Sequence, residues 1–188
     1  MPRLMVFNNV TLDGYFTDAN NDMSWAHSAS QDPEWESFVE ENASGGGVLV
    51  FGRITYELMV SWWPTPQAKK TFPVVAERMN NLPKIVFSRT MDEASWNNTT
   101  LLKGDLAGEI QKRKSEPGDD MVIMGSGTIV SQLTEAGLID EYQIVVHPLV
   151  LGKGRTMFDG IKEKRRMKRT KARIFGNGST LLCYEPVE

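Results

Sequence analysis

The sequence predicts an α/β fold in one domain spanning residues 1–188, with helices on both faces of a mainly parallel sheet. Three observations support this fold class. The chain has 188 residues, of which 40% are hydrophobic, enough for one sizeable core. Short apolar runs alternate with helical patterns along most of its length, which is typical of parallel strands joined by helices. Near the end, Gly176-Asn177-Gly178 separates two strand-like segments and predicts an antiparallel hairpin at the C-terminal edge of the sheet.

In the first part of the chain, the predicted strands are apolar and the predicted helices begin at capping residues. Leu4–Val10 is the first strand, and a polar surface loop covers Asp18–Asp32. Asp32 caps a helix that begins at Pro33, runs to Asn42 and is ended by Gly45-Gly46-Gly47. Val48–Phe51 is a buried strand, and the helix after Gly52 stops before Pro64 and Pro66.

The second part continues the alternation of strands and helices. The predicted strands are Lys84–Ser88, Leu101-Leu102, Met121–Met124 and Tyr142–Val150. The predicted helices are Asp105–Lys114 and Thr128–Ala136, the second of which ends at Gly137.

Composition excludes several classes of protein. The apolar runs are a few residues long, whereas a membrane-spanning helix needs roughly 20 residues. The first residues, Met1–Phe7, lack the long apolar core and cleavage site of a signal peptide. Cys183 is the only cysteine, so no intrachain disulfide can form, which fits a reducing cytoplasm. We therefore expect a cytoplasmic protein without a membrane partner.

The net charge of −3 is unevenly distributed. Residues 162–173 hold eight basic groups and one acidic group. Such a run can bind nucleic acid, but lysines also commonly protect the exposed edge of a sheet. No aromatic residue interrupts the run to stack on single-stranded bases. We therefore favour a solvated strand or loop at a sheet edge and expect no nucleic-acid partner.

Several familiar catalytic motifs do not occur. The sequence contains no phosphate-binding loop of the Gly-x-x-x-x-Gly-Lys-Ser/Thr type, no His-Glu-x-x-His and no Cys-x-x-Cys. The two histidines, His27 and His147, are far apart in the sequence and have no evident third ligand. We therefore expect neither a metal site nor metal-dependent hydrolysis.

Three clusters of Gly, Ser, Thr and Arg follow predicted strands. They are Gly125-Ser126-Gly127-Thr128, Gly52-Arg53-Ile54-Thr55 and Ser88-Arg89-Thr90. Glycines let a backbone approach a ligand closely, and the free N–H groups at a helix start attract phosphate. In open sheets, ligands bind at the carboxyl ends of strands, where all three clusters are expected. Together the clusters predict a site for a nucleotide with several phosphates.

Five motifs in order carry a resemblance to a known family. They are Thr11–Tyr15, Gly52–Glu57, Gly125–Gly127, Leu138–Glu141 and Pro148–Arg155 with a finish at Phe158. In this order they resemble the reductase domain of bacterial bifunctional riboflavin-biosynthesis deaminase-reductases, within the dihydrofolate-reductase-like group. The zinc signature of the deaminase half does not occur here, so the resemblance is to stand-alone members.

The resemblance implies a dihydrofolate-reductase-like fold with three α/β/α layers, about eight strands and an NADPH cofactor. It also implies reduction of a pyrimidine- or pteridine-type substrate, most like that of 5-amino-6-(5-phosphoribosylamino)uracil reductase. A dihydrofolate reductase activity, and a nucleotide- or nucleic-acid-binding protein without turnover, are the alternatives.

The resemblance also implies roles for individual residues. Gly52, Arg53 and Thr55 would bind cofactor phosphates, and Gly125, Ser126, Gly127 and Thr128 the pyrophosphate. Ser88 and Arg89 would bind the adenosine 2′-phosphate, and an arginine beside a hydroxyl suits that extra charge. Asn9, Asp13 and Phe16 would lie beside the nicotinamide, and Trp25 would border the substrate.

Acid catalysis has two candidates, Asp13 and Glu36. Asp13 precedes Gly14, so a turn role is equally consistent with its position. The resemblance to dihydrofolate reductases implies one acid on the helix after this loop, where Glu34, Glu36, Glu40 and Glu41 are available. Counting back from Gly52 favours Glu36, which lies between Trp35 and Phe38, although a solvated carboxylate remains the alternative.

Two further expectations concern the end of the last motif and the oligomeric state. Arg155 binds either a substrate phosphate or only its own loop. The apolar pair Trp62-Trp63, if exposed, favours a homodimer, as in many relatives.

Overall fold

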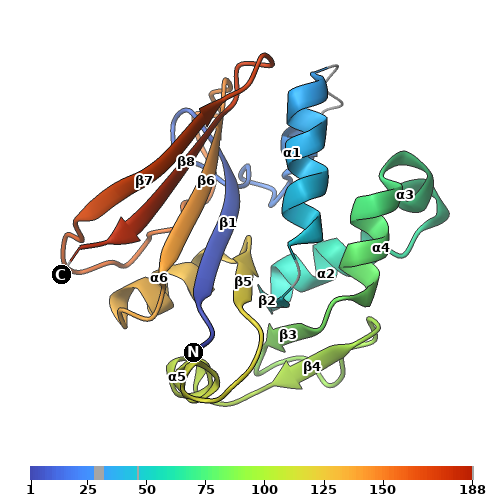
Figure 1. Cartoon of the computed structure of the whole chain (residues 1–188). Helices are drawn as coiled ribbons and strands as arrows, with labels where there is room; N and C mark the ends of the chain where they lie inside the picture. Colours follow the sequence, from blue (N-terminus) through green and yellow to red (C-terminus); the bar gives the residue numbers. More distant parts are fainter. Residues whose placement is uncertain (28–31, 46, 188) are drawn as a thin grey trace.

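A computed structural model describes residues 1–27, 32–45 and 47–187 and contains one eight-stranded sheet with helices on both faces (Figure 1). The strand order is β4-β3-β2-β5-β1-β6-β8-β7. The six parallel strands are β1 (Leu4–Thr11), β2 (Val48–Gly52), β3 (Lys84–Phe87), β4 (Thr99–Leu102), β5 (Met121–Met124) and β6 (Glu141–His147). β7 (Met167–Ile174) and β8 (Thr180–Pro186) are antiparallel. The predicted mainly parallel sheet with an antiparallel C-terminal hairpin is confirmed.

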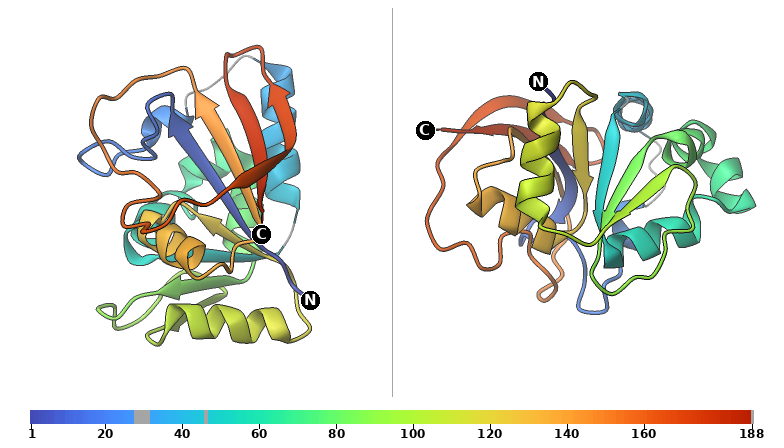
Figure 2. Two further views of the ribbon diagram at one scale, coloured as in Figure 1. Left: turned by 90° about the vertical axis from the view of Figure 1, so that its left-hand side faces the viewer. Right: turned by 90° about the horizontal axis from the view of Figure 1, so that it is seen from below.

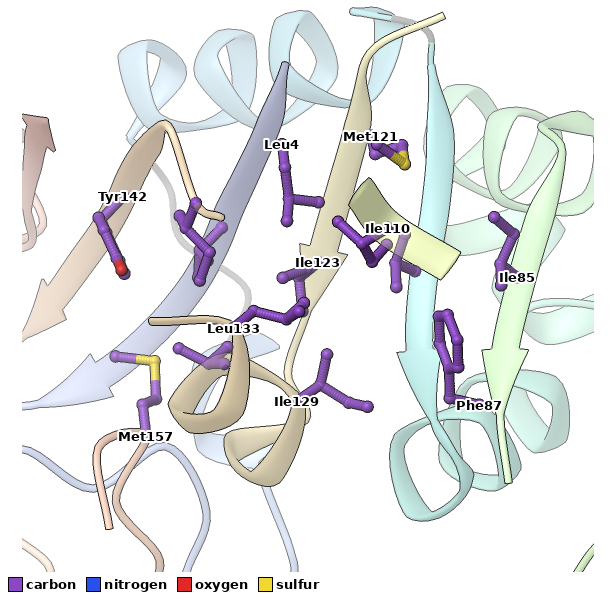
Figure 3. Close-up of a cluster of buried hydrophobic side chains, with 14 of the residues drawn as sticks. Leu4, Ile85, Phe87, Ile110, Met121, Ile123, Ile129, Leu133, Tyr142 and Met157 are labelled. Carbon is purple, nitrogen blue, oxygen red and sulfur yellow. The ribbon is translucent and has the colours of Figure 1, made fainter. Parts of the chain in front are cut away.

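Alternate side chains of the strands divide the core between two layers of helices, one on each face of the sheet. Val6 and Val50 face one layer, where they pack with Ile110 of α5 (Leu106–Ser115) and Leu133 of α6 (Gly127–Glu135). Figure 3 shows Leu4, Ile123, Ile110 and Leu133 in this cluster. The other face of the sheet is covered by α1 (Pro33–Ser44), α2 (Arg53–Trp62), α3 (Pro66–Thr71) and α4 (Pro73–Asn81). The order of layers is therefore α/β/α, as predicted.

The predicted cap of α1 also joins that helix to the C-terminal hairpin. Asp32 Oδ1 accepts hydrogen bonds from the backbone N–H of Glu34 (3.0 Å) and Trp35 (3.4 Å). Asp32 Oδ2 accepts from the N–H of Asn177 in the hairpin turn (3.0 Å). The preceding loop contains a short 3-10 helix, Ser24–His27, and residues 28–31 of the predicted loop and Gly46 of the predicted glycine turn lie outside the described residues.

The sequence prediction missed α3 and α4. Pro64 and Pro66 predict only the end of a helix, yet Pro66 and Pro73 occupy the first turns of these two helices. A proline at the first helical position lacks an N–H that would have no partner there anyway, so it begins a helix as readily as it ends one.

One predicted boundary and one predicted surface are corrected. β6 ends at His147 instead of Val150, because Pro148 has no N–H to continue the ladder. The pair Trp62-Trp63 is not exposed as a unit, since only Trp62 is 39% exposed. Trp63 is buried and its indole N–H donates to Met59 Sδ at 3.1 Å. The predicted homodimer therefore loses this support and stays a prediction.

The basic run occupies the loop before β7 and β7 itself, at the outer edge of the sheet (Figure 2). This placement confirms the sheet-edge interpretation. Arg173 pairs with Glu34 of α1 at 3.0 Å, and Arg165 lies 4.0 Å from Glu135 of α6. None of the described helices is both long enough and apolar enough to cross a membrane.

Candidate functional site

The three predicted phosphate clusters lie at the same edge of the sheet, and two of them line a common cavity. β2 lies between β3 and β5, and all three strands run parallel. Their carboxyl ends, at Gly52, Phe87 and Met124, therefore point the same way, and the clusters that follow them lie side by side.

Two side chains tie the starts of α2 and α6 together. The Gly52 N–H donates to Ser126 Oγ at 2.7 Å, and the Ser126 N–H donates to Thr55 Oγ1 at 3.0 Å. Gly52 and Ser126 are the N-cap residues of these two helices, and neither cap makes a side-chain hydrogen bond to its own helix. The first-turn N–H groups of both helices thus remain without a capping side chain, which suits an anion.

The turn between β5 and α6 has an unusual backbone. Gly125 and Ser126 both have positive φ, +61° and +58°. The side chain of Asn8 on β1 holds this turn, because its Oδ1 accepts from the Gly125 N–H (2.8 Å) and its Nδ2 donates to the Gly125 carbonyl (3.2 Å). Sequence reasoning missed Asn8, although an amide at an inward position of an apolar strand is a signal that it has a specific partner.

A cavity of about 200 Å³, here called the helix-start cavity, opens at these two helix starts. Arg53 and Arg155 are the cationic side chains in its lining. Its other predicted members are Phe16, Gly52, Thr55, Ser126 and Thr128. Arg53 pairs with Glu57 one turn further along α2 (3.1 Å), and Arg155 donates to Asn21 Oδ1 (3.1 Å). Two guanidinium groups and two helix N-termini make this cavity suited to an anion, although Glu57 partly balances the charge of Arg53.

Phe16 fixes the close packing at the start of α6. A Cβ at Gly127 would lie 2.8 Å from the Phe16 ring and 2.8 Å from the carbonyl oxygen of Thr156. There is therefore no room for a side chain at position 127. Glycine at this position lets the start of α6 pack directly against Phe16, which lines the cavity.

A second cavity, of about 300 Å³ and here called the apolar cavity, lies between the sheet and α1, α2 and α4. Met23 lines both cavities, and Gly125 of the apolar cavity is adjacent in the chain to Ser126 of the helix-start cavity. The two cavities therefore adjoin. The apolar side chains that line the second one include Phe7, Trp35, Val39, Met59, Trp63 and Met79.

Asn9, predicted beside the cofactor, lines the apolar cavity. Its Oδ1 accepts a hydrogen bond from His147 Nε2 at 2.9 Å. The ring of Trp25, predicted at the substrate, meets the ring of His147 edge to face, with centroids 5.5 Å apart. Trp35 also meets this ring edge to face, with centroids 5.6 Å apart, so His147 contacts two indoles.

The two predicted acids do not join the other site residues. Asp13 accepts from the Thr11 hydroxyl (2.6 Å) and from the N–H of Gly152 (2.7 Å), and it lines neither cavity. The hydroxyl of Thr11 and the backbone N–H groups hold the pKa of the Asp13 carboxyl below its usual value. Glu36 is exposed on α1 and also lines neither cavity. Within the described residues, Glu41 is the α1 carboxylate that lines the apolar cavity.

Ser88 and Arg89 lie at the carboxyl end of β3 but outside both cavity linings. Ser88 Oγ accepts from the N–H of Thr90 (3.2 Å) and of Met91 (3.1 Å), and Arg89 is exposed. They stand next to the end of β2, where the helix-start cavity begins.

Comparison with known proteins identifies the family. The chain matches the RibD C-terminal domain over residues 2–181 and therefore belongs to that family. The expected resemblance to the reductase domain is thereby confirmed. Among curated proteins, it is similar to the uncharacterized protein YyaP of Bacillus subtilis (strain 168), with 26% identity over 97% of this chain and 94% of YyaP.

Solved structures confirm the fold. A protein from Shewanella sp. PV-4, provisionally named as a riboflavin biosynthesis protein, has a TM-score of 0.77, 23% identity and 99% coverage of both chains. Dihydrofolate reductase from Enterococcus faecalis, complexed with NADP(H) and RAB-propyl, has a TM-score of 0.59 and 18% identity. This comparison covers 99% of this chain and 97% of the reductase, so the fold is dihydrofolate-reductase-like, as predicted.

Proposed function

We propose that this protein is an NADPH-dependent reductase that acts on a pyrimidine- or pteridine-type heterocycle. The nearest activity is the ribosylaminopyrimidine reduction of riboflavin biosynthesis. The observation that carries the proposal is the helix-start cavity, where two uncapped helix N-termini and two arginines converge. Membership of the RibD C-terminal domain family and the likeness to an NADP(H)-binding fold support it.

The residues of the helix-start cavity fit a dinucleotide phosphate group. In the proposal, Gly52, Arg53 and Thr55 at the start of α2 hold one side of the diphosphate, and Gly125–Thr128 hold the other. When bound, NADPH supplies the hydride for the reduction. Hydrogen bonds to the Ser126 and Thr55 hydroxyls hold the starts of α2 and α6 next to each other. The N–H groups of both helix starts can therefore bind the same ligand.

Discrimination for NADPH over NADH is assigned to Ser88 and Arg89. A guanidinium forms paired, charge-assisted hydrogen bonds with a phosphate, and the extra 2′-phosphate of NADPH is the group that distinguishes the two nucleotides. The exposed position of Arg89 at the end of β3 leaves its guanidinium accessible to such a group.

The acceptor is assigned to the apolar cavity. The apolar cavity adjoins the helix-start cavity at Met23 and Gly125, so an acceptor bound there would lie beside the cofactor. Its apolar walls would exclude water from the reacting atoms. Asp13 has no chemical step in the proposal, because its carboxylate is committed to the loop at Leu151 and Gly152. The acid role expected on α1 is assigned to Glu41 and not to Glu36, because Glu41 lines the apolar cavity and Glu36 does not.

The test is a titration of the protein with NADPH and with NADH, followed by quenching of tryptophan fluorescence. We expect saturable NADPH binding and much weaker NADH binding. Arg89→Ala should weaken NADPH binding by about tenfold or more, the effect of one lost charged hydrogen bond, and leave NADH binding unchanged. Arg166→Ala, which removes an exposed arginine near the other edge of the sheet, is the matched control.

Three outcomes separate the alternatives. Binding of neither nucleotide would refute the proposal and leave only a shared fold. Saturable binding without NADPH oxidation by any aminopyrimidine or pterin would favour a nucleotide-binding protein without turnover. Oxidation with dihydrofolate alone would favour the dihydrofolate reductase activity.

A further inference from the structure

We infer that the acceptor reduced by this protein carries no phosphate group and is an uncharged, planar heterocycle or its free riboside. The inference rests on the proposed function, because it assigns the apolar cavity to the acceptor. It narrows the substrate class relative to the phosphoribosyl compound that the family resemblance implies.

The first observation is the charge of the cavity wall. Among the described residues that line the apolar cavity there is no lysine or arginine, and the one charged side chain is the carboxylate of Glu41. Residues 28–31 and 46, which the structure does not describe, are Ser, Ala, Ser, Gln and Gly in the sequence and supply no lysine or arginine. A phosphate bound in this cavity would therefore meet the Glu41 carboxylate, which lies 3.9 Å from Arg173, and no cation among the described lining residues.

The second observation is the polarity of the helices around the cavity. α1 contributes Glu41, Asn42 and Ala43 from its last turn, and α2 contributes Met59 near its C-terminal end and Trp63, its C-cap. First-turn residues also line the cavity, Trp35 of α1 and Val75 of α4, but the α1 N–H groups there already bond to Asp32. The C-terminal end of a helix carries partial negative charge, whereas the N-terminal end is positive. The same helix α2 thus presents its anion-binding end to the helix-start cavity and its anion-repelling end to the apolar cavity.

The third observation is that nearby cations are engaged elsewhere. Lys84 is buried, and its ammonium donates to the carbonyls of Asn80 (3.1 Å), Leu82 (2.7 Å) and Asn97 (3.0 Å). Arg173 pairs with Glu34 at 3.0 Å and lies 3.9 Å from Glu41. Neither cation is therefore available to a phosphate.

The lysines of α3 do not serve either. Lys69 and Lys70 are exposed on this helix and do not line the apolar cavity. The described lining of the apolar cavity therefore differs from that of the helix-start cavity in cationic side chains, which only the helix-start cavity has.

The side chains that line the apolar cavity suit a flat ring with neutral polar edges. Trp35, Phe7 and Trp63 supply aromatic walls. Asn9 gives its oxygen to His147, and its Nδ2 has no partner in the described part of the chain, so it can donate to a carbonyl of the acceptor. Aromatic walls and neutral amides recognise the base of a pyrimidine or pterin and not an anionic tail.

The experiment compares 5-amino-6-ribosylaminouracil with its 5′-phosphate. Binding of each is measured by tryptophan quenching with NADP⁺ present, and NADPH oxidation by each is measured as a second readout. We expect the free riboside to bind at least as tightly as the phosphate, with a two- to fivefold preference, the effect of one helix end. Binding of the phosphate ten times more tightly than the riboside, or of neither compound, would overturn the inference.

A charge-insertion variant makes the test independent of turnover. Asn42→Arg places a cation in the wall of the apolar cavity and should raise affinity for the phosphate over the riboside by about tenfold. Gln111→Arg, at an exposed position of α5 on the opposite face of the sheet, should leave the ratio unchanged. An equal ratio in wild type and Asn42→Arg would show that the compounds bind outside this cavity and would refute the assignment.

The NADPH titration separates the two failures. If NADPH binds but the phosphorylated acceptor is strongly preferred, the proposed function stands and the inference falls. If NADPH does not bind, the proposed function falls, and the inference that depends on it falls with it.

Discussion

The substitution Gly125→Ala tests the backbone of the turn that joins β5 to α6. Gly125 has φ +61°, and a Cβ built on it would lie 2.7 Å from Thr55 Cγ2 and 2.8 Å from Thr55 Oγ1. Real Cβ atoms essentially never approach so closely, so Thr55 must move. Its hydroxyl is the acceptor for the Ser126 N–H, and that hydrogen bond of 3.0 Å would then be lost.

The expected loss of unfolding free energy is the sum of two costs. A left-handed backbone costs an alanine about 1 kcal/mol or slightly more. A buried N–H left without a partner costs about 1–3 kcal/mol. Together they predict a loss of about 2–4 kcal/mol, which corresponds to a fall in Tm of roughly 5–15 °C for a chain of this size.

The assay is urea unfolding of Gly125→Ala, Thr55→Ala and the double variant. Thr55→Ala removes the two atoms that the new Cβ would meet, and the remaining Thr55 Cβ lies at 3.4 Å. In that background Gly125→Ala should cost only the backbone term, so the double variant should lose about 1–3 kcal/mol less than the sum of the single variants.

Gly137→Ala supplies a matched control for the backbone term. Gly137 also has positive φ, +67°, but a Cβ added there would meet no atom within 4 Å. It should therefore lose only about 1 kcal/mol. If Gly125→Ala costs no more than Gly137→Ala, or if the double variant is additive, the reasoning from the Thr55 contact is wrong.

Two further predictions concern pH. The pKa of Asp13 is lowered by the Thr11 hydroxyl and the N–H of Gly152, so its contribution to stability is present above its usual pKa and is lost as pH falls through the lower folded value. Asp13→Asn should flatten this acid dependence in urea titrations, and an unchanged slope would contradict the prediction. Burial lowers the pKa of Lys84 from 10.5 to about 8, so between these values the unfolded chain binds more protons and stability rises with pH. The variant Lys84→Met should lack this alkaline rise, whereas an identical rise in both proteins would assign it to another group.

Much of the local structure follows from signals within a few residues. Asp32 before Pro33 determined where α1 begins, and the apolar runs at Val48 and Met121 determined two central strands. Gly176-Asn177-Gly178 predicted the hairpin between β7 and β8. These signals are reliable because capping, side-chain periodicity and turn geometry depend on neighbouring residues alone.

Segments with conflicting local signals are not predictable in this way. Pro66 and Pro73 each begin a helix, but a proline followed by polar residues is equally typical of a break. Trp62 and Trp63 are adjacent and look alike in the sequence, and only the packing of α2 against α4 and the sheet shows that Trp63 is buried.

At the candidate site, the sequence determined which turns follow strands. Because parallel strands end at one edge of a sheet, it also predicted that Gly52 and Gly125 lie close together. Only the tertiary structure decided that Ser126 and Thr55 cross-link two helix starts and that Asn8 holds the turn between β5 and α6. It also decided that Glu41, and not Glu36, lines the apolar cavity. These outcomes depend on the rotation and packing of whole elements, and one step along a helix turns a side chain by about 100°, which no local pattern fixes.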